Sequence, residues 1–83
     1  MNDEQLLNLT NVLNSEDGFE LVKVLLDKLG AFERGINVNA SDKEILITQS
    51  RRQLGLWLLD NCYCANPNKY MEILKERFIY DRN

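Results

Sequence analysis

Apolar residues recur at helical spacing in four stretches of this chain, and the longest stretch runs from Ser41 to Ala65. It reads SDKEILITQSRRQLGLWLLDNCYCA and contains the only tryptophan. At 3.6 residues per turn it predicts one helix of about seven turns. Ser41 followed by Glu44 indicates a capping box at its start, and Asn66-Pro67 indicates its end and the start of the next helix. We expect the other elements to pack against this central helix.

The central helix is predicted to be apolar on nearly every side. A helix with this pattern is usually buried or shared with a partner. In a chain of 83 residues one helix is rarely surrounded by its own neighbours, so the pattern favours an oligomer or a larger assembly. The apolar residues fall into three groups around the helix: Ile47, Leu54, Leu58 and Ala65; Leu46, Trp57 and Cys64; and Ile45, Leu56, Leu59 and Tyr63.

Arg51 and Gly55 interrupt this apolar pattern. Arg51 falls between apolar positions, where its stem is expected to lie along the edge of the core with its head in water or paired to a carboxylate. The alternative is an interface anchor that reaches a carboxylate on another chain. Glycine inside a helix is about 1 kcal/mol less favourable than alanine, so Gly55 predicts the close approach of another backbone, within the chain or from a second one.

Three shorter helices are predicted around the central one. Residues 3–13 form a short amphipathic helix that docks on its own domain or serves as an arm for another subunit. Residues 16–29 form a core-facing helix that Asn14 or Ser15 caps and Gly30 ends, and residues 68–80 form the last helix. The apolar faces of these helices contain Leu6, Leu9 and Leu13; Phe19, Val22, Leu26 and Leu29; and Tyr70 or Met71, Leu74 and Phe78, with Ile73 beside them.

The connection before the central helix is the only long one. Phe32 is expected to fold back over the end of the second helix, and Ile36-Asn37-Val38 to form at most a brief extended piece. The chain is therefore predicted to be all-α, a small helical bundle of three to four helices built around a long central helix at about residues 41–65. We assign residues 1–14 to an N-terminal short helix or arm and residues 15–83 to a single helical domain.

Composition argues against several kinds of chemistry. The net charge is −3 and the chain has no histidine, so it lacks the commonest general base and transition-metal ligand. Cys62 and Cys64 are two positions apart on a helix and point to different sides, so we expect buried, reduced thiols with no disulfide and no metal site. The chain shows no catalytic pair and no phosphate-binding glycine loop. We predict that it is not an enzyme and uses no cofactor.

The pattern of charge and hydropathy favours neither a membrane nor a nucleic acid as partner. The N-terminal residues are acidic and lack the basic region of a signal peptide. No apolar run approaches the ~20 residues that span a bilayer, so no transmembrane segment is expected. The basic residues do not gather into a patch, and Trp57 on an apolar side is more typical of a core than of base stacking.

Several short motifs occur together between Ser15 and about Leu74. They are Ser15-Glu16-Asp17-Gly18, Leu29-Gly30-Ala31-Phe32, the block Arg51-Arg52-Gln53-Leu54-Gly55-Leu56-Trp57-Leu58-Leu59, and Asn66-Pro67 with Tyr70. In this combination the chain resembles a family of short, uncharacterised helical proteins of tailed bacteriophages. Ser50 stands where that family often has glycine before the two arginines. The resemblance implies a phage protein whose gene lies among those for head, portal and packaging proteins, and it implies no known activity.

Three functional hypotheses follow. The leading one is a virion-associated or assembly protein that acts by protein–protein contact, with a copy of itself or with phage portal, head or tail proteins. Arg51, Arg52 and Trp57 are the candidate contact residues. The alternative is a small phage factor that binds and modulates a host protein, and a weak nucleic-acid-binding module ranks third. We expect the protein in the virion or the host cytoplasm, with a homo-oligomer among its expected forms.

Overall fold

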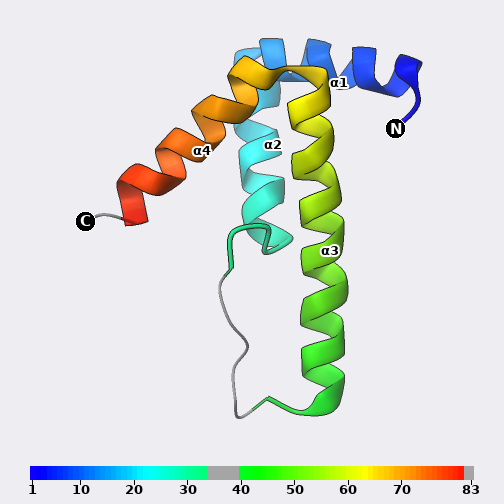
Figure 1. Ribbon diagram of the computed structural model, residues 1–83, viewed down its shortest axis with the longest axis vertical. Helices are drawn as coiled ribbons and strands as arrows, with labels where there is room; N and C mark the ends of the chain where they lie inside the picture. The colour runs from blue at the N-terminus through cyan, green and yellow to red at the C-terminus, as the bar shows by residue number, and fades with distance from the viewer. Residues whose placement is uncertain (34–39, 82–83) are drawn as a thin grey trace.

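Four helices contain most of the residues that the structure describes. The structure is a computed structural model that describes residues 1–33 and 40–81, with side-chain surroundings up to Arg77. The predicted Ile36-Asn37-Val38 piece lies outside the described residues. The helices are α1 (Asp3–Asn14), α2 (Glu16–Lys28), α3 (Asp42–Ala65) and α4 (Pro67–Asp81), and the described residues contain no strand (Figure 1). The all-α prediction and the long central helix are confirmed.

Short polar side chains set the start of α1 and of α3. Asn2 Oδ1 accepts a hydrogen bond from the Gln5 amide at 2.8 Å, and Gln5 Oε1 accepts one from the Asn2 amide at 3.0 Å. Asn2 and Gln5 thus form a complete capping box, which was not predicted. At α3, Ser41 Oγ accepts from the Glu44 amide at 3.2 Å. Among the described contacts, only this half of the predicted Ser41 capping box is present.

The ends of α2 and α3 follow the sequence signals. Ser15 Oγ caps α2 by accepting from the amide of its third residue at 2.9 Å. Gly30 follows α2 with a φ of 74°, a left-handed conformation that glycine adopts without strain. Asn66 Oδ1 accepts from the Lys69 amide at 3.2 Å, so Asn66 ends α3 and caps α4, which begins at Pro67.

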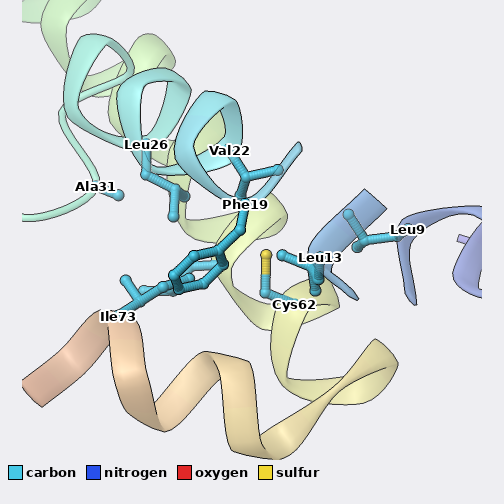
Figure 2. Close-up of a cluster of buried hydrophobic side chains, with 9 residues drawn as sticks. Leu9, Leu13, Phe19, Val22, Leu26, Ala31, Cys62 and Ile73 are labelled. Atoms are coloured by element: carbon cyan, nitrogen blue, oxygen red, sulfur yellow. The ribbon is translucent and has the colours of Figure 1, made fainter. Parts of the chain in front are cut away.

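The core forms where α2 and the C-terminal half of α3 meet α1 and α4 (Figures 1 and 2). Each helix contributes one of the four most deeply buried side chains. In Figure 2 the ring of Phe19 points toward Ile73, and the sulfur of Cys62 lies beside Leu13. The buried apolar residues are Leu9, Leu13, Phe19, Val22, Leu26, Ala31, Leu59, Cys62 and Ile73, with Phe32, Leu58, Ala65 and Tyr70 packed against them.

Gly55 marks the point where α3 crosses the end of α2. A Cβ atom at Gly55 would lie 3.0 Å from the Cβ of Leu29, 3.2 Å from the Cβ of Ala31 and 3.2 Å from the backbone nitrogen of Ala31. The close backbone approach that the glycine predicted is therefore present, and it occurs within one chain. The buried residues of α3 are Gly55, Leu59 and Cys62, Leu58 and Ala65 pack partly against the core, and several other apolar residues of α3 are exposed.

Packing departs from the predicted faces in α4 and at one cysteine. Ile73, predicted beside the apolar face, is one of the most buried residues, whereas Met71 is half-exposed. The side chain of Phe78 lies outside the described residues. Cys62 is buried as expected, but Cys64 is exposed, so the prediction of two buried thiols was wrong for Cys64. Two positions correspond to about 200° around a helix, which turns Cys64 away from the core that holds Cys62.

The two thiols are expected to react very differently. Burial raises the pKa of Cys62 to about 11, above its ordinary value of 9.0. Iodoacetamide at pH 8 should therefore modify Cys64 in the folded chain and reach Cys62 only after unfolding, as read by peptide mass mapping. Because the folded pKa is raised, the stabilising contribution of the neutral thiol is complete below pH 9 and is lost as the pH rises through about 11. Equal labelling of both thiols in the folded chain would contradict this placement.

Candidate protein-contact surface

One side of α3 carries a row of large apolar side chains that are open to solvent. Leu46, Ile47, Leu54 and Trp57 are 64%, 57%, 51% and 47% exposed. At about 100° per residue they fall within one sector of the helix, on the side turned away from the buried residues of α3. Ser50 lies in the same sector. Isolated exposed apolar residues are ordinary, but a continuous row of this length is typical of an interaction surface.

The same sector contains no charged residue between Leu46 and Trp57. Its polar members are Ser50 and Gln53, which are neutral. Charged side chains normally cover the solvent side of a surface helix, so their absence from this sector is informative. We call the six residues the α3 stripe: Leu46, Ile47, Ser50, Gln53, Leu54 and Trp57.

The α3 stripe begins where the cover provided by α1 ends. The N-terminal ammonium of Met1 lies 3.4 Å from Asn61 Oδ1, and Thr10 Oγ1 donates to the carbonyl oxygen of Ala65 at 2.9 Å. Asn61 and Ala65 lie on the stripe side of α3, one turn or more beyond Trp57. Figure 1 shows α1 crossing only this C-terminal end of α3. Among the helices that the structure describes, α1 therefore covers one end of this side of α3, and the side chains at the other end are exposed.

The three contact residues predicted from sequence point to three different sides of α3. Arg51 Nη2 lies 3.3 Å from each carboxylate oxygen of Glu33, so its carboxylate partner is on its own chain. Both side chains are half-exposed, and a pair of this kind contributes less than about 1 kcal/mol. Arg52 is exposed about 100° further round the helix. Of the three, only Trp57 belongs to the α3 stripe.

A cavity lies between α2 and α4. Its volume is about 360 Å³. Lys23 Nζ lies 2.8 Å from Glu20 and 3.1 Å from Glu76, and hydrogen bonding to Glu20 is the largest cause of the raised pKa of Lys23. Arg77 pairs with Asp27. Because these charges are engaged in ion pairs that connect α4 to α2, the α3 stripe is the stronger candidate site.

Comparison with known proteins adds no assignment to this surface. No protein-family model, no curated protein and no solved structure matches the chain. Among the helices of the described residues, none combines the length and apolar character that crossing a membrane requires. Within the same residues, no three histidine, cysteine or acidic side chains gather where they could hold a metal ion. The α3 stripe itself is therefore the basis for a functional proposal.

Proposed function

We propose that this chain acts by protein–protein contact through the α3 stripe, as a non-enzymatic virion-associated or assembly protein of a tailed bacteriophage. The observation that carries the proposal is the row of four large apolar side chains, each about half-exposed on one uncharged side of the longest helix. The phage setting rests on the resemblance of the block from Arg51 to Leu59 and its companion motifs to a phage protein family.

The energetics of the stripe support a contact function. Fully burying a leucine or isoleucine side chain contributes about 1.5–3 kcal/mol, so completing the burial of these half-exposed side chains contributes roughly 1 kcal/mol each. Trp57 is of the residue type that most often dominates interface energies. Association also costs translational, rotational and side-chain entropy. The free energy that is left after this loss stabilises the contact.

Particle association tests this function. Tagged chain produced during phage infection should sediment with virions or assembly intermediates in a density gradient. Leu54→Glu places a charge in the middle of the α3 stripe and should leave the chain at the top of the gradient, because a buried, unpaired carboxylate strongly disfavours association. Met71→Glu is the matched control, since it adds the same charge at a half-exposed apolar residue of α4. Met71→Glu should sediment like wild type.

Two outcomes would contradict the proposal. Wild-type chain that is absent from both virions and intermediates has no assembly role, and recovery with a host protein instead would favour a factor that modulates the host. Leu54→Glu that still sediments with particles would remove the α3 stripe as the contact surface.

A further inference from the structure

The chain exposes more surface than a compact chain of its mass requires. Its accessible surface is 6271 Å². A folded monomer of 9.7 kDa exposes about 5,100 Å², so the excess is about 1,100 Å². Each subunit of a standard protein–protein interface contributes about 800 Å². The radius of gyration of 14.0 Å also exceeds the value of about 12 Å for a compact domain of this length. The α3 stripe, with four large side chains that are each about half-exposed, can supply part of one subunit's share of a dimer interface.

We propose that the occupant of the α3 stripe is a second copy of this chain, and that the two α3 helices pack antiparallel across a two-fold axis between Ser50 and Leu54. This inference rests on the proposed contact function and names its first partner. It joins the longest helix of each chain through the side that the chain itself leaves uncovered.

The charge pattern of the stripe suits self-association. Each chain carries a net charge of −3, so two copies repel one another unless they meet through uncharged surface. In a two-fold interface the same patch faces itself, and any charge within it meets a like charge near the axis. The six stripe residues are neutral, and Arg51 beside them is paired with Glu33. A charged partner protein would instead lose hydration at this surface without gaining a counter-charge.

The spacing of the stripe fits an antiparallel helix pair. Ile47, Ser50, Leu54 and Trp57 follow steps of three, four and three residues, the spacing with which two helices interlock their side chains. Antiparallel pairing places Ser50 opposite Leu54 and Ile47 opposite Trp57, so that the small side chain of Ser50 meets a large one and the two Trp57 side chains do not face each other. Parallel pairing would set Trp57 against Trp57 and leave a gap between two serines. The order of small and large side chains along the α3 stripe therefore favours the antiparallel arrangement.

The position of α1 favours the same arrangement. The contact of Met1 with Asn61 holds α1 across the C-terminal end of α3 on the stripe side. In an antiparallel pair, α1 of each copy lies over the uncovered N-terminal part of the other α3, near Leu46. In a parallel pair, both α1 helices would compete for one end. Antiparallel pairing thus covers the part of α3 that no helix of the same chain reaches.

Light scattering behind size exclusion, at several concentrations, tests the dimer. Wild type and Met71→Glu should have twice the chain mass of 9.7 kDa, and Leu54→Glu should have the single-chain mass with its helical circular dichroism retained. A monomeric wild type, or a Leu54→Glu chain that stays dimeric, overturns the inference. A monomeric wild type that still sediments with particles through the stripe overturns the dimer and leaves the proposed contact function standing, so the two failures are distinguishable.

Cross-linking tests the orientation even if Leu54→Glu fails to fold. In a C64S background, a mixture of S50C and L54C chains should form a disulfide-linked dimer under mild oxidation more readily than either variant alone. Q49C mixed with L54C is the control, because Gln49 lies outside the stripe and should not cross-link. Preferential linkage of S50C to itself would indicate parallel pairing and overturn the inference, as would a mixture that yields no linked dimer.

Discussion

Replacing Leu26 with alanine is expected to lower the free energy of unfolding by about 3 kcal/mol. Leu26 is 0% exposed and lies in the cluster where all four helices meet. Alanine leaves a cavity that the other side chains of the buried cluster can fill only in part. Small domains are stable by roughly 5–15 kcal/mol in total, so the loss is a large share of the whole. Urea unfolding followed by circular dichroism at one fixed protein concentration measures it.

Leu25 provides the control for Leu26. It is the preceding residue on α2, it has the same chemistry and helix propensity, and its side chain is 43% exposed. Leu25→Ala should lower the free energy of unfolding by less than about 1 kcal/mol, because no closed cavity is created. If the two substitutions have equal effects, then α2 does not bury the face that the structure assigns to it.

Gly18→Ala is expected to destabilise the chain by about 2 kcal/mol or more, although alanine favours helices over glycine by about 1 kcal/mol. A Cβ atom at Gly18 would lie 2.3 Å from the carbonyl oxygen of Val12 and 2.9 Å from its Cγ1. That carbonyl accepts a hydrogen bond from the Ser15 amide at 3.1 Å, so moving it would break this hydrogen bond in the turn between α1 and α2. The methyl group must therefore push the two helices apart.

Asp17→Ala is the matched control for this corner, since Asp17 is exposed in the same turn of α2. Losing a carboxylate near a helix N-terminus costs about 0.3–1 kcal/mol, well below the effect expected at Gly18. Thermal unfolding of the two variants separates these values. A Gly18→Ala chain as stable as wild type would show that α1 and α2 do not meet this closely.

The helix boundaries were predictable because their signals are local. Ser15, Gly30 and Asn66-Pro67 act on backbone groups one to four residues away, and each ends or begins a helix where the sequence indicated. Gly55 was equally informative, because a glycine inside a helix indicates that another backbone passes too close to leave room for a side chain. These features need no knowledge of the tertiary arrangement.

The buried side of α3 could not be predicted from the same pattern. A helix that is apolar all round has no amphipathic direction, so its sequence does not select Leu59 over Leu54 for the core. The choice is made by the close approach at Gly55, which turns one side toward α2 and the opposite side to solvent. The α3 stripe was therefore visible as apolar positions, but its exposure follows from packing. The pairing of Arg51 with Glu33 depends on the same tertiary geometry.

The one-sided cover of α3 has a consequence for amide hydrogen exchange. Contacts of α1 and α2 hold the region from Gly55 to Ala65, whereas most residues in the first three turns after Asp42 are exposed. In an isolated chain, amides in those turns exchange through local fraying, and amides near Cys62 exchange only when the whole chain unfolds. When the α3 stripe is covered, protection spreads toward Asp42. Deuterium uptake along this one helix therefore reports whether its surface is free or occupied.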